Sequence, residues 1–256
     1  AGTGGGTPPM GGKICARLAL LHGHAPLESQ EDSMKLGLVL ECDSSGADEL
    51  VLTCFARRLA PGIHVQSTAL GSKKELFNNG TEAAAELVES SKCDLVLIAW
   101  DLKPYWGKVA PNCEAEADEL REKIKSLAPA TAARIKLLCL TWELETWLIA
   151  DPRAVNAHLS TPAHRSNFRC NSPLTKDDAK AFLDGECRKH RGRSRRYVDF
   201  REAIQIARLI PDTSKIKDVH SFQRFSKLVS GATDKFKQPG NACDDLAHQA
   251  FRMGRP

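Results

Sequence analysis

The chain has 256 residues, of which 42% are hydrophobic and 27% charged, and its formal net charge at pH 7 is +4. A chain of this length can hold one large domain or two small ones with a substantial buried core. Its apolar runs are far shorter than the roughly 20 residues of a membrane-spanning helix, and its small net charge gives no general argument for nucleic-acid binding. We therefore expect a globular protein in the cytoplasm, without a membrane partner.

The N-terminal segment has the composition of a tail. Residues 1–12 are rich in glycine and contain two prolines, and such a composition cannot build a packed core. The first strong structural signal directly follows Met34. We therefore expect an N-terminal tail over residues 1–33 and a folded domain that begins at residue 34.

The most informative stretch begins with a short apolar run, Leu36–Leu40, which is followed by Glu41 and a cluster of turn residues. A run of this length, bounded by a turn, is typical of a strand that is buried on both faces of a parallel sheet. Apolar residues then recur at helical spacing over Leu50–Leu59. Asp48 and Glu49 fall in the first turn of this helix, where the helix dipole favours anions.

Two later segments repeat this pattern of a strand followed by an acid. Leu95–Trp100 leads directly into Asp101, and Ile135–Leu140 is followed closely by Glu143. In a doubly wound sheet the carboxyl ends of parallel strands form one edge, so these two acids and Glu41 are expected to converge. Converging carboxylates favour a hard divalent cation, Mg2+ or Mn2+, among them. The alternative for each single acid is a solvated strand end or a helix cap.

The segment after the third strand predicts two short helices in series. Thr141 is placed to cap the first helix, in which Glu143 and Trp147 share a face. Asp151 precedes a proline, so it ends this helix and is best interpreted as the cap of the next one. For Glu145 a dipole or capping role is the alternative to a role in the site.

The expected elements outside these strands are a strand at Ile63–Val65 and helices at Thr81–Ser90, Glu114–Leu127, Ala179–Cys187, Phe200–Leu209 and Ser221–Leu228. Together the elements predict an α/β fold, with a Rossmann-like domain and a mainly parallel sheet over residues 34–160. A helical C-terminal region over residues 161–230 follows, and residues 231–256 form a tail. The helical region either covers one side of the sheet or forms a small second lobe.

The cluster of acids and a run of basic residues together indicate a phosphate-rich substrate. Six basic residues crowd one short stretch: Arg188, Lys189, Arg191, Arg193, Arg195 and Arg196. Such a run is usually a solvated loop, but it is also typical of a segment that contacts a phosphate backbone. Trp100, Tyr105 and Trp106, in and beside a loop near the acids, are candidates for stacking on a base or for filling a gap beneath that loop.

The nine cysteines do not form a recognisable disulfide framework. Cys42, Cys54, Cys93 and Cys139 lie in or beside predicted core elements, where a free cysteine behaves as a small hydrophobe. This pattern suits a reducing compartment. The spacing of cysteine and histidine around Cys187 matches no standard zinc pattern.

Several motifs resemble those of a TOPRIM-like bacterial family known as domain of unknown function 4276, which is related to OLD-type nucleases. The motifs are L-V-L-E followed after five residues by A-D-E-L-V-L (Leu38–Leu52), E-L-E-T-W-L-I-A-D (Glu143–Asp151), R-R-Y-V-D-F (Arg195–Phe200) and H-S-F-Q-R-F (His220–Phe225). The second motif is rather specific and the first less so. The resemblance extends over roughly residues 34–228.

This resemblance implies a TOPRIM-like nuclease of the kind encoded beside ABC-type ATPases, often in defence against phage. The acids that it marks are Glu41, Asp48, Glu49, Asp101, Glu143 and Glu145, as ligands of Mg2+ or Mn2+. The chain departs from the TOPRIM pattern in a longer turn after Glu41 and in Lys103, which stands where the usual Asp-x-Asp motif has its second aspartate. The loss of that ligand leaves open whether one or two metal ions are bound.

We therefore expect a metal-dependent phosphodiesterase that acts on DNA or RNA and works with an ABC-type ATPase partner. Glu41 and Asp101 would hold the metal, Asp48 or Glu49 would complete a second position, and Lys103 would contact the scissile phosphate or the leaving oxygen. The alternative is a non-catalytic module that binds an ATPase as effector or inhibitor. Phosphoryl transfer to a nucleotide is less favoured because the chain has no Walker A loop. The sequence does not decide between a monomer and a homo-oligomer.

Overall fold

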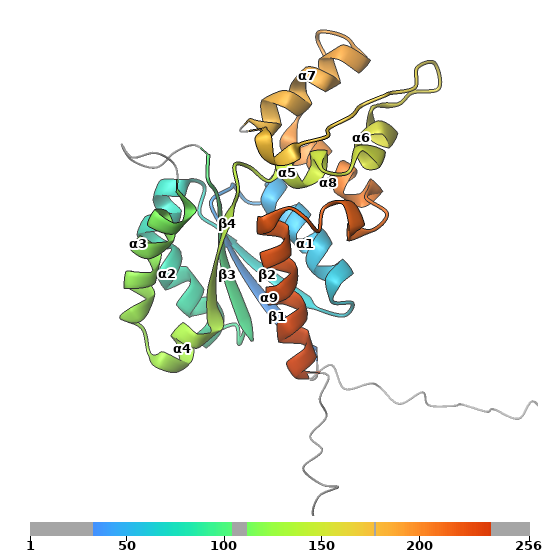
Figure 1. Cartoon of the computed structure of the whole chain (residues 1–256). Helices are drawn as coiled ribbons and strands as arrows, with labels where there is room; N and C mark the ends of the chain where they lie inside the picture. Colours follow the sequence, from blue (N-terminus) through green and yellow to red (C-terminus); the bar gives the residue numbers. More distant parts are fainter. Residues whose placement is uncertain (1–32, 104–111, 177, 237–256) are drawn as a thin grey trace, which may run out of the picture. The chain divides into compact units, whose positions relative to one another are not determined.

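A computed structural model describes residues 33–103, 112–176 and 178–236 (Figure 1). At its centre lies a four-stranded sheet in which all neighbouring strands are parallel, in the order β2-β1-β3-β4. The strands are β1 (Lys35–Leu40), β2 (His64–Ala69), β3 (Leu95–Asp101) and β4 (Ile135–Leu140). The predicted α/β fold, with a parallel sheet followed by a mainly helical region, is confirmed. The expected N-terminal tail (except Ser33), residues 237–256 of the expected C-terminal tail, Tyr105 and Trp106 lie outside the described residues.

Nine α-helices and two short 3-10 helices accompany the sheet within the described ranges. The α-helices are α1 (Ala47–Leu59), α2 (Lys73–Glu89), α3 (Cys113–Lys125), α4 (Pro129–Arg134), α5 (Glu145–Ile149), α6 (Pro152–Leu159), α7 (Ala179–Arg191), α8 (Asp199–Leu209) and α9 (His220–Phe236). The 3-10 helices, η2 (Pro173–Thr175) and η3 (Thr213–Lys215), connect the later α-helices. None of these helices has the length and apolar content needed to cross a bilayer.

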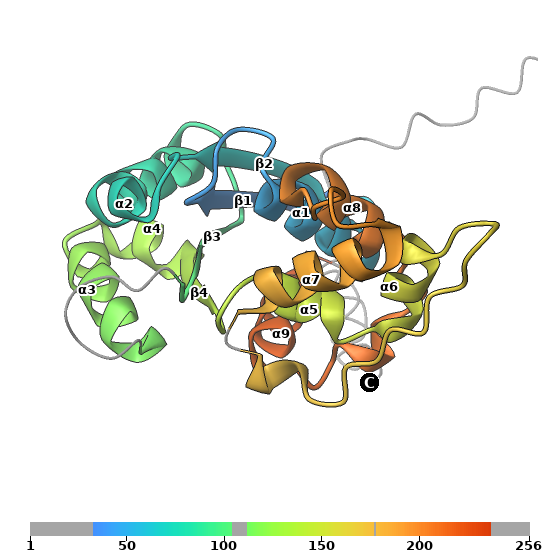
Figure 2. The ribbon, with the colours of Figure 1, turned by 90° about the horizontal axis from the view of Figure 1, so that it is seen from above.

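Helices cover both faces of the sheet. Helices α1 and α9 lie on one face, and α2 and α3 lie on the other (Figure 2). Successive strand residues point to opposite faces, so Leu38 and Leu40 pack with Phe55 of α1, whereas Val39 packs with Phe77 of α2. Burial on both sides explains why the two central strands, β1 and β3, are apolar without alternation.

The sequence left open whether the C-terminal region covers one side of the sheet or forms a small second lobe. Helix α9 covers one face of the sheet, while α5, α6, α7 and α8 gather beyond the carboxyl ends of the strands (Figure 1). An aromatic cluster joins the two parts, because Trp147 of α5 lies 5.0 Å from Phe222 and 5.5 Å from Phe225 of α9, between ring centroids. The indole N–H of Trp147 also donates to Ser221 Oγ at 2.8 Å. Helix α9 continues to Phe236, beyond residue 230, where we expected the helical region to end.

Two predictions for the segment after β4 have opposite outcomes. Asp151 caps α6 as expected, because its carboxylate accepts a hydrogen bond from Arg153 N at 3.0 Å. The prediction for Thr141 is wrong. Helix α5 begins only at Glu145, because Trp142 adopts a left-handed conformation with φ of +65°. A bulky residue rarely adopts this conformation, and it turns the chain between β4 and the helix.

The expectation that Cys139 is a free core thiol is also wrong. Cys139 of β4 forms a disulfide with Cys113 at the start of α3, and the two Cα atoms lie 5.7 Å apart. The two residues are 26 positions apart in the sequence, and only the packing of α3 beside β4 brings them together. Cys42, Cys54 and Cys93 are free.

Candidate functional site

The strand order places Glu41 and Asp101 at the point where the direction of winding reverses. The chain runs from β1 outward to β2 and then crosses back to β3 on the other side of β1. Ligands of open α/β sheets bind at such a point, outside the carboxyl ends of the strands. Leu40, the last residue of β1, is level with Ala99 of β3, so Glu41 and Asp101 extend from neighbouring strand ends.

These two acids are in direct contact. The backbone N–H of Asp101 donates to Glu41 Oε1 at 3.0 Å. The other oxygen of Glu41, Oε2, and one oxygen of Asp101, Oδ1, are buried without a hydrogen-bond partner among the described residues. Buried polar atoms are nearly always satisfied in folded proteins, so these two oxygens mark a place where a ligand is expected.

Burial also shifts the protonation of this pair. Desolvation raises the pKa of Glu41 from its ordinary value of 4.5 to about 8, and the nearby carboxylate of Asp48 acts in the same direction. Desolvation likewise raises the pKa of Asp101 well above its usual value, together with the repulsion from Asp48 and Glu41. For both carboxylates desolvation is the main cause, and at Glu41 it outweighs the positive charge of Lys73, which lowers the pKa.

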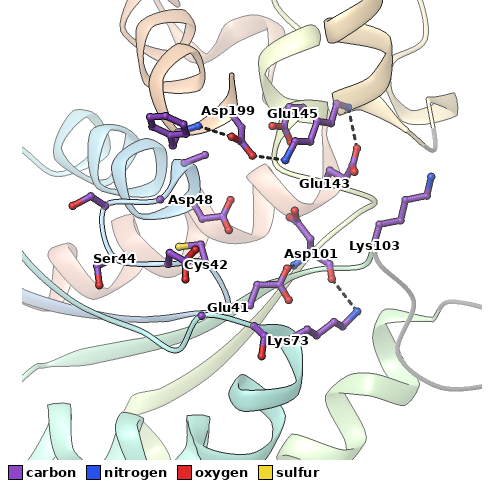
Figure 3. Close-up of a pocket in the computed structure, with 18 residues that line it drawn as sticks. Glu41, Cys42, Ser44, Asp48, Lys73, Asp101, Lys103, Glu143, Glu145 and Asp199 are labelled. Carbon is purple, nitrogen blue, oxygen red and sulfur yellow. Dashed lines mark hydrogen bonds and ion pairs between the residues drawn. The ribbon is translucent and has the colours of Figure 1, made fainter. Parts of the chain in front are cut away.

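Asp48 reaches the same space from the first turn of α1 (Figure 3). The β1–α1 turn closes tightly before it, since Gly46 N donates to Asp43 O at 2.9 Å. A Cβ atom at Gly46 would meet that same carbonyl oxygen at 2.8 Å, so the turn requires glycine. Desolvation raises the pKa of Asp48 to about 6, although the positive charge of Lys180 lowers it.

Lys73, at the start of α2, fixes the end of β3 from the other side. Its Nζ donates to the carbonyl oxygens of Asp101 and Leu102, both at 3.0 Å, and forms an ion pair with Glu116 of α3 at 2.9 Å. The side chains of Lys73 and Glu116 are only 5% and 8% exposed. The indole of Trp100 donates to the second oxygen of Glu116 at 2.8 Å, so the group is a buried, connected network. Trp100, a candidate for base stacking or for filling a gap, is buried within this network.

The C-terminal helices supply a second set of carboxylates, each with its own partner. Glu143 Oε2 accepts from the backbone N–H of Lys180 at 2.9 Å. Glu145 is buried, and its Oε1 accepts from the hydroxyl of Tyr197 at 3.2 Å. Desolvation raises the pKa of Glu145 to about 7. The ammonium group of Lys180 pairs with Asp199, at the start of α8.

Most of these residues line one cleft of about 680 Å3. They are Lys73, Lys180 and the acids Glu41, Asp48, Asp101, Glu143, Glu145 and Asp199. Figure 3 shows the carboxylates turned toward a common space between the strand ends and the helices. Seven carboxyl groups and three ammonium groups line the cleft, so their formal charges sum to minus four when all are ionised (seven minus three). A cleft of this charge repels a phosphate unless a cation is bound in it.

The donor set fits a hard divalent cation. Among the described residues, no group of three or more His, Cys, Asp or Glu side chains is arranged as a metal site by itself. Mg2+, however, commonly takes one or two carboxylates and completes its shell with water and substrate phosphate. The unpartnered oxygens of Glu41 and Asp101 are two such donors.

Two of the predicted site residues have other partners. Glu49 does not line the cleft: it lines a separate pocket, where its carboxylate accepts from Ser45 N and Ser67 Oγ, both at 2.7 Å. Lys103 does line the cleft. Its side chain is 19% exposed, and its Nζ lies 3.8 Å from Asp178 Oδ2.

The structure divides the predicted basic run into two halves. Arg188 pairs with Asp184, Lys189 with Glu186 and Arg191 with Glu202, so these three cations are already neutralised by acids of α7 and α8. The other three, Arg193, Arg195 and Arg196, are exposed in the connection between α7 and α8. None of these three forms an ion pair with another described residue.

Sequence reasoning missed four residues that line the cleft and one that binds Glu145 beside it: Lys73 and Lys180, and then Tyr197, Asp199 and Phe200, of which Tyr197 is the one outside the cleft. The R-R-Y-V-D-F motif marked the last three by resemblance but indicated no role for them. The position of Lys73 at a helix start had a local signal in Ser72, which caps α2 by accepting from Glu75 N at 3.2 Å. We expected that helix to begin eight residues later, at Thr81.

Comparisons of the chain with protein-family models, with curated proteins and with solved structures find no match.

Proposed function

We propose that this protein is a metal-dependent nuclease of a TOPRIM-like class, which hydrolyses phosphodiester bonds of DNA or RNA. The observation that carries the proposal is the pair of buried, unpartnered oxygens on Glu41 and Asp101 at the winding reversal of the sheet. The order of strand, Glu41, tight turn and Asp48 in the first turn of α1 further supports the TOPRIM-like class.

Glu41 and Asp101 would hold Mg2+ or Mn2+ through these oxygens, and Asp48 would face the open side of the ion. The chemistry that the ion would supply when bound is Lewis-acid polarisation of a phosphoryl oxygen. Lys73 positions the pair, because it holds the carbonyl groups at the end of β3 and thereby the backbone N–H that binds Glu41.

The basic residues of the cleft orient the phosphate. Lys103 is tethered through its backbone, which donates to Trp142 O at 2.9 Å, and its ammonium group is placed to contact the scissile phosphate or the leaving oxygen. Lys180 lies near Asp199 and the two glutamates of the β4–α5 segment, whose negative charges it balances. With Glu143 and Glu145 already hydrogen-bonded, the helical side shapes the cleft around the ion.

The proposal is tested by cleavage of plasmid DNA, single-stranded DNA and RNA in the presence of Mn2+. Glu41→Gln is expected to lower the rate at least about 100-fold, because it removes a carboxylate charge from the ion while it keeps the side-chain volume. The matched control is Glu82→Gln, at an exposed position on α2 without an ion pair among the described residues. Equal rates for wild type and Glu41→Gln would contradict the proposal.

A second candidate function is favoured by Lys103, which occupies the position of an acid in the TOPRIM pattern. In this case the chain is a non-catalytic effector or inhibitor that binds an ABC-type ATPase. The resemblance proposes such a partner for the nuclease as well. Co-purification with an ATPase, combined with no Mn2+-dependent cleavage by either protein alone or by both together, would favour this candidate over the nuclease.

A further inference from the structure

Phe200 is an exposed aromatic residue at the cleft. Its side chain is 59% exposed, whereas Phe55, Phe77, Phe222 and Phe225 are buried. A single exposed hydrophobic residue is common on protein surfaces, so its position is the informative feature. Phe200 lines the cleft that contains the carboxylates, and most of the other residues that line this cleft are polar or charged.

The backbone around Phe200 is held firmly. The N–H of Phe200 donates to Asp199 Oδ1 at 2.8 Å, and the other oxygen of Asp199 binds Lys180 of α7. Glu202 accepts from Val198 N at 2.7 Å and closes the first turn of α8. The ring is therefore presented from a fixed helix start, which lowers the entropy lost when a ligand binds to it.

The three exposed arginines, Arg193, Arg195 and Arg196, precede Phe200 in the chain. Arg196 is four residues from Phe200, so their Cα atoms lie at most about 14 Å apart. The connection is anchored to α7, because Tyr197 N donates to Asp184 Oδ1 at 2.8 Å, and Arg195 N closes a turn on Gly192 O at 2.9 Å. An aromatic surface next to free guanidinium groups is the combination that binds single-stranded nucleic acid.

We propose that Phe200 stacks on one unpaired base of a single-stranded nucleic acid, while Arg195 and Arg196 bind phosphates adjacent to that base. This inference rests on the proposed nuclease function, since it names the substrate form of the same cleft. In a duplex the faces of the bases are covered by their neighbours, so only an unstacked base can lie on the ring. The cleft volume of about 680 Å3 is also that of a small-ligand site, which suits one nucleotide.

The test is fluorescence anisotropy with labelled 12-nucleotide oligo(dT) and oligo(U), and with a duplex of the same length. Ca2+ replaces Mn2+, so that binding is measured apart from cleavage. Phe200→Ala is expected to weaken binding of the single strands about 5- to 150-fold, the range found for one stacked base. Phe200→Trp is expected to retain the affinity. Leu209→Ala, at the other end of α8 and 43% exposed, is the matched control and is expected to bind like wild type.

The double variant Arg195→Ala/Arg196→Ala is expected to weaken binding and to lower the salt slope by about 1.4, which is about 0.7 for each lost phosphate contact. Equal affinity of wild type and Phe200→Ala for single strands would overturn the inference, and so would tighter binding of the duplex. If binding depends on Phe200 but no Mn2+-dependent cleavage is found, the nuclease function is contradicted and the base subsite is supported. If cleavage depends on Glu41 but not on Phe200, the nuclease function is supported and the base subsite is contradicted.

Discussion

The cleft has two walls that are built differently. In this comparison the strand wall comprises Glu41, Asp101 and Lys73, and the helix wall comprises Glu143, Glu145 and Lys180. On the strand wall two carboxylate oxygens are buried without partners and the lysine is buried. On the helix wall Glu145 accepts a hydrogen bond from a tyrosine, and the lysine pairs with an acid while 49% exposed.

The difference indicates which wall binds the ion. A buried carboxylate oxygen without a donor is stabilised by a cation, and among the described residues Glu41 and Asp101 have such an oxygen, whereas Glu145 does not. We therefore assign ion binding to the strand wall and shaping of the cleft to the helix wall. The predictions below test this division of roles.

The largest contrast is expected between the two lysines. Lys73→Met removes one partner of a buried ion pair and leaves Glu116 without its counter-charge, so we expect the free energy of unfolding to fall by about 3–5 kcal/mol. Lys180→Met breaks a solvent-exposed pair with Asp199 and should change the free energy of unfolding by at most about 1 kcal/mol. Urea denaturation measures both. Adding Glu116→Gln to Lys73→Met should restore part of the loss, and equal losses for the two lysine variants would remove the contrast between the walls.

Without divalent cations, stability is expected to fall as the pH rises. Desolvation raises the pKa of Glu41 from 4.5 to about 8, so between these values the folded protein holds a proton that the unfolded chain releases. The free energy of unfolding should then decrease between about pH 5 and 8, by an amount on the order of 3 kcal/mol at about 1.4 kcal/mol per pKa unit. Thermal unfolding in EDTA at several pH values across this range measures the fall in stability.

Glu41→Gln separates this effect from other titrations. The amide does not ionise, so the variant should show a flatter pH profile and should be more stable than wild type at pH 8 in EDTA. Mn2+ should restore the stability of the wild type at pH 8, because it binds the ionised carboxylates. Parallel pH profiles of the two proteins would show that Glu41 keeps an ordinary pKa.

The smallest effect is expected on the helix wall. Tyr197→Phe removes the hydroxyl that donates to Glu145 Oε1, and the loss of one such bond should lower the free energy of unfolding by about 1 kcal/mol. The rate of Mn2+-dependent cleavage should fall less than 10-fold, since this contact shapes the cleft without touching the ion. A loss as large as that of Glu41→Gln would place the chemistry on the helix wall instead.

The two acids of the strand wall could be predicted from the sequence because their signals are local, whereas Lys73 was missed. Leu36–Leu40 and Leu95–Trp100 are unbroken apolar runs that place Glu41 and Asp101 directly at strand ends, and a parallel sheet then brings those ends together. The cap at Asp151 was predicted for the same reason, since a cap and the proline after it are neighbours in the chain.

On the helix wall Glu143 and Glu145 were expected at the site, but their partners could not be predicted because the contacts join distant positions. Glu145 and Tyr197 are 52 residues apart, and only the packing of the C-terminal helices brings them together. Glu49 shows the converse: its place in the first turn of α1 was right, but the turn directs its carboxylate to Ser45 and Ser67. The disulfide between Cys113 and Cys139 likewise depends on packing and has no local signal.

The central claim is that Glu41 and Asp101 together hold one divalent cation. Isothermal titration calorimetry of Mn2+ into wild type, Glu41→Gln, Asp101→Asn and the helix-wall control Glu143→Gln tests it most directly. The account predicts saturable binding by wild type, a loss of affinity of about 100-fold or more in either strand-wall variant, and a change of less than about 10-fold in Glu143→Gln. Equal affinity in wild type and Asp101→Asn would contradict it.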